Sequence, residues 1–579
     1  MHRNLLPFLK ISLLCLLLIP TTEIWGQQDT AGIVQVEILN ARTLRGSQQP
    51  NEPMALIGDV QLRQEGNLMY CDSAWINQLT NNVEAFGNVT IIQPGGTEVV
   101  SDYLRYTGNT RMAYLRGNVV LSDGQNTLWA EELEYNLNTR VGVYTLGGTL
   151  QSEATTLSSN SGTYWARTKD SRFSGDVFVN DPEYEVTSVD LGYNTETKLV
   201  TFYGPSVVIS DRSVLRTSQG TWDGLREIAH FTSRSSIQNQ EQYIEADSLD
   251  YNRGTGWGYS RGNVIAIDTL NRTTLFCGYA QYNQISRQLL ATIRPVMKQV
   301  SENDSLYIRA DTFYAAPHVF PDTLKDTVEV NLLSKDVTES TRVTTKDTAG
   351  ADTTQPRYFI AYHHVLIFSD SLQARCDSLL YSEVDSAMRL MSSTVASDGF
   401  PPVAWSRNSQ ITGDTILLYL DSNKLKEIYI PNNAFVNSRS GPEKANMYDQ
   451  VQGRTLTGYF EGNTVREMIV FPQAEAIYYS TDESGAYLGV NQAQSERMRI
   501  YFEDQEVSRI VLEQQVKQTM TPMLQADISG MRLSRFQWYE QRRPESIQEL
   551  FLYDPYAPLA TGDEDAASED VQLTKPDMK

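Results

Sequence analysis

The chain has 579 residues and a formal net charge of -23 at pH 7. Its basic residues are not clustered, and so acidic a chain lacks the positive surface that phosphate binding needs, which excludes nucleic acid as a partner. Its length exceeds what one hydrophobic core usually holds, so we expect two lobes.

The N-terminal residues have the pattern of a secretory signal peptide. Arg3 and Lys10 precede an apolar run over residues 11–19, and the small residue Gly26 ends a short stretch after that run. We therefore predict a signal peptide over residues 1–26 and an exported protein. Later stretches fall short of the 18 apolar residues that indicate a membrane helix.

An internal repeat follows. A bulky apolar or aromatic residue closes a short strand-like segment every 29 to 31 residues, at Ile76, Tyr106, Tyr135, Tyr164, Tyr193, Trp222, Tyr251 and Tyr282. A fixed period of this length is typical of one supersecondary unit per repeat, and such units bury their apolar faces by stacking. The pattern predicts a solenoid or a curled sheet.

A second mark recurs with the same period. A glycine and a short polar residue precede a β-branched run, as in Gly87-Asn-Val-Thr-Ile91 and Gly117-Asn-Val-Val-Leu121. We interpret the glycine as a turn at positive φ, and the alternating residues after it as a strand with one buried face. The residues expected to face the interior are Val60, Leu62, Val89, Ile91, Val119, Leu121, Val177, Val179, Val207, Ile209 and Val264.

Each period has room for two or three strands of about five residues and none for an ordinary helix, so the predicted fold class is all-β. The regular repeats are expected over 27–316, a polar linker or loop over 317–356, and looser repeats over 357–518. A capping or docking segment over 519–553 and a disordered acidic tail over 554–579 complete the predicted organisation.

Reactive side chains are few. Cys71, Cys277 and Cys376 remain after the predicted cleavage, and their odd number and wide spacing favour packing roles over disulfides. His363 and His364 would point to opposite faces of a strand, which disfavours a shared metal ion.

Recurring aspartates are the remaining candidates for chemistry, as calcium ligands or as acid and base groups. They are Asp72, Asp102, Asp247, Asp311, Asp377 and Asp414. Intervening copies carry Val189 and Gly278 instead, so we interpret the aspartates as groups that form hydrogen bonds in turns. We predict no catalytic residue, no metal, no cofactor and no enzymatic activity.

The signal peptide, the Gly-Asn-Val pattern and the Ser/Ala-Asp/Glu-x-Leu-x-Tyr strand together resemble the OstA-like family of lipopolysaccharide-transport proteins. The resemblance is close over residues 34–316 and loose over 357–518. It implies an open β-jellyroll whose two sheets form a V-shaped groove, lined by the inward-facing residues given above, that holds the acyl chains of lipopolysaccharide.

The resemblance also implies a periplasmic carrier that acts toward the outer membrane. Its implied partners are lipopolysaccharide or lipid A, other lipopolysaccharide-transport components, and further copies of the chain joined head to tail. We expect the free edges near residues 33–38 and near Leu512 to make these junctions, and a Val36→Pro change to cap the first edge.

Two alternatives remain at this point. One is a secreted parallel β-helix that binds or degrades polysaccharide, and the other is a structural surface repeat. An apolar groove open along its length would distinguish the carrier from a closed β-helix. The aromatic ladder fits either packing within the stack or direct contact with lipid.

Overall fold

The computed structural model describes residues 34–46, 52–210, 212–301, 304–318, 356–392, 400–421, 424–461, 464–482, 484–503 and 506–552. The predicted signal peptide, most of the predicted linker and the acidic tail lie outside these residues. The chain divides into two compact units, one of residues up to 153 together with 161–167, and one of residues 154–160 together with those from 168 onward.

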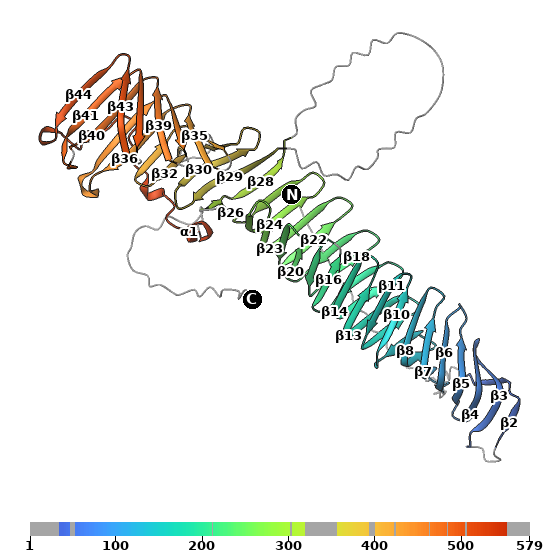
Figure 1. Cartoon of the computed structure of the whole chain (residues 1–579). Helices are drawn as coiled ribbons and strands as arrows, with labels where there is room; N and C mark the ends of the chain where they lie inside the picture. The colour runs from blue at the N-terminus through green and yellow to red at the C-terminus, as the bar shows by residue number, and fades with distance from the viewer. Residues whose placement is uncertain are drawn as a thin grey trace, which may run out of the picture. The chain divides into compact units, whose positions relative to one another are not determined.

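The first unit consists of short and long strands (Figure 1). They are β1 (Glu37–Asn40), β2 (Thr43–Arg45), β3 (Met54–Gln64), β4 (Asn67–Asn77), β5 (Asn82–Ile92), β6 (Glu98–Thr107), β7 (Met112–Ser122), β8 (Asn126–Asn136), β9 (Val141–Tyr144), β10 (Gly148–Ser152) and β12 (Ser161–Trp165).

The second unit continues the same pattern and adds the helix α1 (Ile547–Leu552). Its strands are β11 (Thr155–Ser159), β13 (Asp170–Asn180), β14 (Tyr184–Asn194), β15 (Leu199–Phe202), β16 (Ser206–Ser210), β17 (Val214–Thr217), β18 (Gly220–Asp223), β19 (Ile228–Phe231), β20 (Ser235–Gln238), β21 (Gln242–Ala246), β22 (Ser248–Asn252), β23 (Trp257–Asp268), β24 (Thr273–Asn283), β25 (Gln288–Thr292), β26 (Val296–Val300), β27 (Ser305–Arg309), β28 (Thr312–Pro317), β29 (Arg357–Phe368), β30 (Gln373–Ser382), β31 (Ala387–Met391), β32 (Val403–Ser406), β33 (Ser409–Thr412), β34 (Thr415–Asp421), β35 (Lys424–Ile430), β36 (Ala434–Ser440), β37 (Met447–Gly453), β38 (Thr455–Glu461), β39 (Thr464–Phe471), β40 (Ala474–Thr481), β41 (Tyr487–Ser495), β42 (Arg497–Glu503), β43 (Glu506–Glu513) and β44 (Lys517–Pro522).

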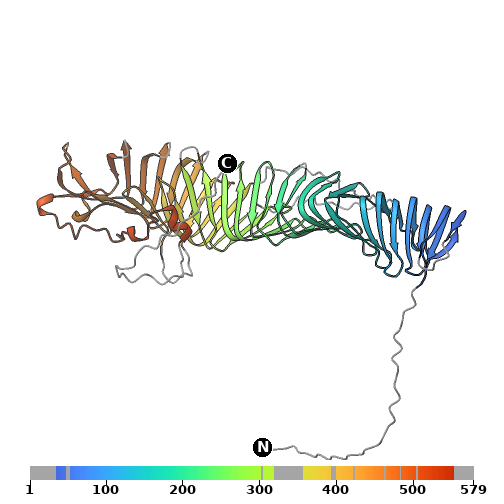
Figure 2. The ribbon, with the colours of Figure 1, turned by 90° about the horizontal axis from the view of Figure 1, so that it is seen from below.

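The described strands pair antiparallel, for example β3 with β4, β23 with β24 and β41 with β44. In Figure 2 the colours of the strands of the second unit follow the chain order along that unit. The prediction of an all-β, jellyroll-type fold is confirmed. The parallel β-helix alternative is wrong, because neighbouring strands in a parallel β-helix pair in parallel, whereas the described strands pair antiparallel. None of the described helices is long and apolar enough to cross a membrane.

Each long strand contributes to two walls. The first half of β4 pairs with residues 60–64 of β3, whereas its second half pairs with residues 54–57. We call the wall built from half-strands like 60–64 and 67–71 the valine wall, and the wall built from half-strands like 73–77 and 103–107 the tyrosine wall. One period of the repeat is a hairpin of two such bent strands.

The recurring glycine lies at the bend between the walls, which corrects its interpretation as a turn. In β3, Gly58 and Asp59 both have positive φ (79° and 48°), yet the residues on either side of them pair with the same neighbour, β4. Two residues therefore oppose the single residue Asp72, which is the definition of a β-bulge. The left-handed pair bends the strand from one wall into the other without reversing it.

The recurring aspartates hold these corners together. The amide nitrogen of Asn88 in one bulge donates to the carboxylate of Asp72 on the neighbouring strand at 2.8 Å, and Asn118 donates to Asp102 at the same distance. Asn263 donates to Asp247 at 2.7 Å. The predicted hydrogen-bonding role of the aspartates is thus confirmed at these positions, and its location is the corner.

The predicted linker interrupts a hairpin. β28 and β29, which flank it, pair with each other, and the backbone nitrogen of His318 donates to the carbonyl of Pro356 at 2.8 Å. The two walls continue on both sides of this insertion. The two compact units divide near residue 160.

The N-terminal edge differs from the expectation for Val36. That residue is 3% exposed, and its backbone nitrogen donates to the side chain of Asn81 at 2.8 Å. The outermost strands of the first unit are instead β1, which pairs with the valine-wall half of β3, and β2, which pairs with the tyrosine-wall half. Val36→Pro would remove a buried hydrogen bond, so it is not a neutral edge cap.

Candidate functional site

The space between the two walls holds most of the residues predicted to face the interior. Nearly all are at most 4% exposed, namely Val60, Leu62, Val89, Ile91, Val119, Leu121, Val177, Val179 and Val264. They alternate with outward-facing residues, as a pleated strand requires.

Val207 and Ile209 lie on the opposite face, so their prediction is wrong. Ile209 is 47% exposed, and the inward positions of β16 are taken by Ser206 and Val208. The glycine at 204 is followed by proline and serine, so counting the apolar residues from Val207 shifts the register by one. In a strand such a shift moves every side chain to the other face.

In the first unit the two walls are joined at their rim. The hydroxyl of Tyr135 on the tyrosine wall donates to the Gln93 amide oxygen on the valine wall at 2.5 Å, and Tyr106 donates likewise to Gln64. The amide nitrogen of Gln93 donates onward to the carbonyl of Leu137 at 3.0 Å. We call each such tyrosine–glutamine pair a rim clasp.

Burial makes the rim clasps strong. Tyr106 and Tyr135 are 0% exposed, and Gln64 and Gln93 are 2% and 3% exposed. Burial raises the pKa of both tyrosines above its ordinary value, so the hydroxyls remain protonated donors. Breaking the tyrosine–glutamine hydrogen bond would leave a buried amide without a partner, which is energetically unfavourable. The clasps therefore keep the rim closed.

One row of cross-strand neighbours on the valine wall shows how completely this part is closed. Its members are Leu62, Met69, Ile91, Val99, Leu121 and Leu128, each at most 2% exposed. We call the region of β3 to β8 the closed section.

The equivalent row in the second unit is open. Its members are Val208, Leu215, Ile237, Ile244 and Ala266, all half-buried and successive partners across β16, β17, β20, β21 and β23. The facing aromatic residues Trp222 and Tyr251 are half-buried as well. We call this region, over residues 206–268, the open section.

The aromatic residues of the open section do not clasp the opposite wall as Tyr106 does. Tyr251 donates its hydroxyl to Gln284 at 2.6 Å, and Gln284 belongs to a turn at the end of the tyrosine wall itself. Tyr282, the next member of the ladder, is 36% exposed. We call this inward row of partly accessible apolar side chains, from Val208 to Ala266, the apolar trough.

A small enclosed cavity precedes the trough. Leu157, Val179 and Val186 of the valine wall face Leu191 and Val200 of the tyrosine wall around a void of about 10 Å³. Such a volume admits one water at most. The cavity is lined largely by apolar side chains, so the interior changes from filled to accessible between here and the trough.

The cysteines and the histidine pair considered in the sequence lie at or next to the corners. Cys71, Cys277 and Cys376 are buried, and burial raises the pKa of the Cys71 thiol to about 11, which leaves it unreactive as a nucleophile. His363 and His364 replace the glycine and asparagine of a bulge, and their Nδ1 atoms lie 3.1 Å from Asp377 and 2.7 Å from Asp311. Among the residues described, no cluster of three potential metal ligands occurs.

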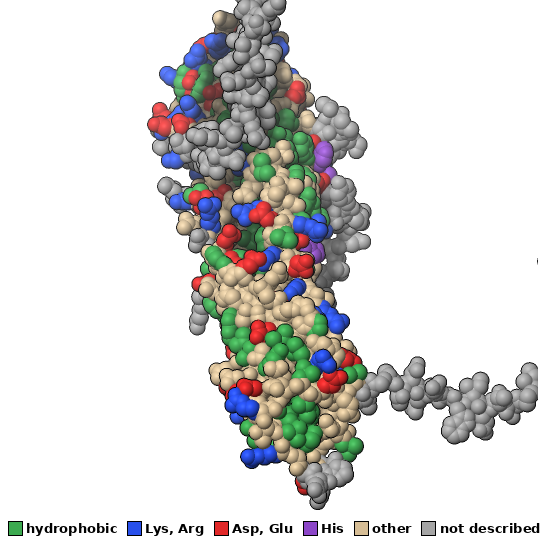
Figure 3. Space-filling view, turned by 90° about the vertical axis from the view of Figure 1, so that its right-hand side faces the viewer, with side chains coloured by type: hydrophobic (Ala, Val, Ile, Leu, Met, Phe, Trp, Pro, Cys, Tyr) green, Lys and Arg blue, Asp and Glu red, His purple; other side chains and the backbone are tan. Residues whose placement is uncertain are grey.

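The surface gives no single-sign field on the side shown in Figure 3, where acidic, basic and hydrophobic side chains are interspersed. The net charge of -23 therefore does not mark one binding patch there. The feature with a distinctive chemistry is the apolar trough.

An all-β stack of bent hairpins around an apolar interior defines the class of fold. Residues 34–189 match the family described as OstA-like protein, so this part of the chain is an OstA-like domain, and the resemblance seen in the sequence is confirmed there. No curated protein sequence matches the chain.

Among solved structures, the chain is similar to LptH from Pseudomonas aeruginosa, the LptA-homologous periplasmic component of its lipopolysaccharide transport device. The identity is 15%, the match covers 26% of this chain and 95% of LptH, and the TM-score is 0.19.

Sequence reasoning missed the rim clasps. Each glutamine lies 42 residues before its tyrosine, as Gln64 does before Tyr106 and Gln93 before Tyr135. This offset, longer than one period, is the signal that could have revealed them.

Proposed function

We propose that the chain is a periplasmic transport protein that binds lipopolysaccharide, with acyl chains held in the trough of the open section. The observation that carries the proposal is the half-buried row from Val208 to Ala266, because apolar side chains facing inward at an accessible place need an apolar occupant.

Physical magnitudes support a lipid as that occupant. Burying one CH₂ group stabilises binding by about 0.8 kcal/mol, so a chain of about 14 carbons supplies on the order of 10 kcal/mol. Five strands about 4.8 Å apart give a trough of about 20 Å. Since lipid A and this protein are both acidic, the affinity comes from acyl burial.

Transport requires a continuous path, and we further propose that copies of the chain or other transport components join at the free edges. β1 and β44 both belong to the valine wall, whereas β2 and β43 both belong to the tyrosine wall. Antiparallel or parallel addition of β44 to β1 of the next copy would continue the same wall.

Lipid analysis tests the binding proposal. The full chain, purified from the periplasm, should carry lipopolysaccharide detectable by mass spectrometry. Protein that is folded and consistently free of lipid A would contradict it.

The junction is tested separately with cysteines. Leu39 on β1 is 44% exposed and Met520 on β44 is 51% exposed, so L39C and M520C should give disulfide-linked oligomers. The matched pair of L39C with V507C, on β43 of the other wall, should give few. Equal yields would contradict the proposed junction.

A further inference from the structure

The C-terminal segment of the chain lies along the outer face of the valine wall. Residues 523–552, which we call the strap, follow β44 and run back past earlier strands. The backbone nitrogen of Leu533 donates a hydrogen bond to the side chain of Gln450 on β37, and that of Tyr539 donates to Gln410 on β33. The guanidinium of Arg543 donates to the side chain of Gln373 on β30. The strap thus crosses the wall strand by strand toward the N-terminus.

The wall recognises the strap through its backbone. Gln410 accepts from the backbone nitrogen of Tyr539 at 2.7 Å and donates to the carbonyl of Gln537 at 2.9 Å. Gln450 binds the backbone of Met531 and Leu533 in the same way, at 2.9 and 2.8 Å. These glutamines are 0% exposed, so this outer face binds an extended peptide.

The described part of the strap ends on the row of outward residues next to the corner. Phe551 of α1 packs edge-on against Phe276 of β24, with ring centroids 5.6 Å apart. From Phe276 the row of cross-strand partners continues without a break through Ile265, Glu245 and Ser236 to Arg216.

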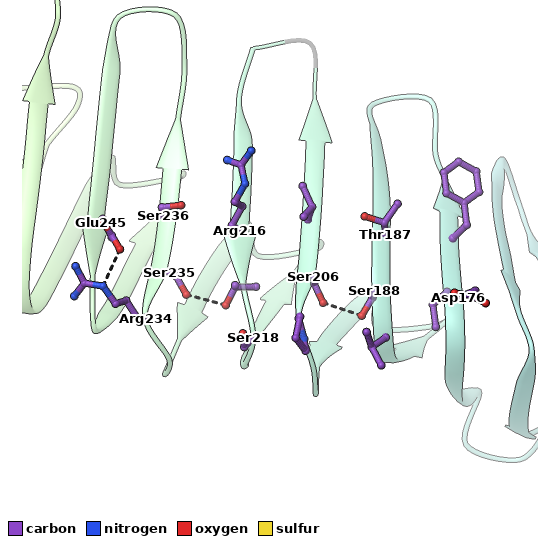
Figure 4. Close-up of a pocket in the computed structure, with 16 residues that line it drawn as sticks. Asp176, Thr187, Ser188, Ser206, Arg216, Ser218, Arg234, Ser235, Ser236 and Glu245 are labelled. Atoms are coloured by element: carbon purple, nitrogen blue, oxygen red, sulfur yellow. Dashed lines mark hydrogen bonds and ion pairs between the residues drawn. The ribbon is translucent and has the colours of Figure 1, made fainter. Parts of the chain in front are cut away.

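This row leads directly into a groove of about 760 Å³ on the outer face of the valine wall (Figure 4). Its apolar lining includes Phe178, Val189, Pro205 and Val207. Phe178 is 41% exposed, and Val207 is the half-buried residue that sequence reasoning had assigned to the interior. Arg216, also in the lining, is exposed and forms no ion pair with the residues that the structure describes.

We infer that the groove is the docking site of the chain's own residues 553–562, which continue the strap. These residues read Tyr-Asp-Pro-Tyr-Ala-Pro-Leu-Ala-Thr-Gly, an apolar and proline-rich segment that suits an apolar groove. The acidic run from Asp563 to Asp565 follows directly after this segment.

The lengths agree. Seven strand steps separate β24 from β13 along the valine wall, which is about 34 Å at 4.8 Å per step. Ten extended residues span about 33 Å. The inference does not rest on lipid binding, because the groove lies on the outside of the wall whose inner side forms the trough.

Disulfide trapping in the full chain tests the docking. Thr187 is exposed in the groove, so T187C combined with A560C should form an intrachain disulfide on mild oxidation. The matched control is L199C with A560C, because Leu199 is 36% exposed on the outer face of the tyrosine wall. Docking raises the effective concentration, so the groove pair should react on the order of tenfold faster.

A third variant adds V207D to the groove pair, which places a carboxylate on the apolar lining while leaving the interior unchanged. In this variant the rate of disulfide formation should fall to that of the L199C and A560C control. Equal rates for the groove and control pairs, a disulfide that joins two chains instead of one, or a rate unaffected by V207D would each overturn the inference.

Discussion

The closed and open sections are built from the same repeat but differ in how completely their inward side chains are buried. In the closed section the inward row from Leu62 to Leu128 is at most 2% exposed, whereas the corresponding row from Val208 to Ala266 is half-buried. Both rows are apolar. The closed row lies on the long bent strands β3 to β8, whereas the open row lies mainly on the short strands β16, β17, β20 and β21. The difference lies at the rim, where Tyr106 and Tyr135 bond across to Gln64 and Gln93.

The filled section has buried tyrosine–glutamine hydrogen bonds at its rim, and the accessible section has none of this kind among its described residues, although both rows are apolar. A filled section contributes stability, because each buried aliphatic side chain is worth about 1.5 to 3 kcal/mol. An accessible section gives up part of that stabilisation and leaves apolar surface in contact with solvent.

The largest expected effect is on folding in the closed section. Ile91→Asp should destabilise the fold by at least about 3 kcal/mol, because an unpaired carboxylate would replace a side chain that is 0% exposed. Ile209→Asp, the same change at an outward residue, should cost less than about 0.5 kcal/mol. Urea unfolding measures the free energy of unfolding of both variants. Similar midpoints for the two would contradict the assignment of Ile91 to the inward face and Ile209 to the outward face.

The open section should respond in binding more than in stability. Leu215→Asp places a charge in the half-buried row, so we expect the lipid retained per protein to fall by at least about tenfold, equivalent to about 1.4 kcal/mol. Val214→Asp, on the outward face of the same strand, is the control and should retain lipid. Quantitative lipid mass spectrometry distinguishes them. Loss of lipid from both variants, or from neither, would argue against the trough.

The rim clasps should each contribute about 1 kcal/mol, the value of a buried hydrogen bond whose loss leaves an amide unpaired. Tyr106→Phe and Tyr135→Phe are therefore expected to destabilise the closed section. Tyr282→Phe, at a 36% exposed member of the same ladder, should change little. In a double-mutant cycle of Tyr106→Phe with Gln64→Leu, the two changes in the free energy of unfolding should be coupled. Strictly additive changes would contradict a direct interaction between the two side chains.

The smallest effect is expected at alkaline pH. Burial raises the pKa of Tyr106 and Tyr135 in the folded chain, while unfolded tyrosine ionises near pH 10. Above about pH 10 the unfolded state therefore holds fewer protons than the folded state, and the free energy of unfolding falls as pH rises. The doubly substituted Tyr→Phe protein should show a shallower decline, and an unchanged slope would contradict the assigned environment.

Much of the architecture could be predicted because it is local. The 29-residue period and the alternation after each glycine place Val89 and Ile91 inward, as the structure has them. The same rule fails at Ile209, because Ser206 occupies the first inward position and hydrophobicity alone cannot show the shift. The rim clasps and the path of the strap depend on contacts between distant residues, such as Gln373 with Arg543, which a periodic pattern does not contain.

The most direct test of the trough is photo-crosslinking in cells, with a photoreactive amino acid at one position at a time. Ile237, inward in the open section, should crosslink to lipopolysaccharide, whereas the outward residue Ser236 beside it on β20 should not. Lipid adducts are expected at Ile237 and at Ile244. Adducts of equal yield at Ser236, or none at either inward position in a folded protein, would contradict it.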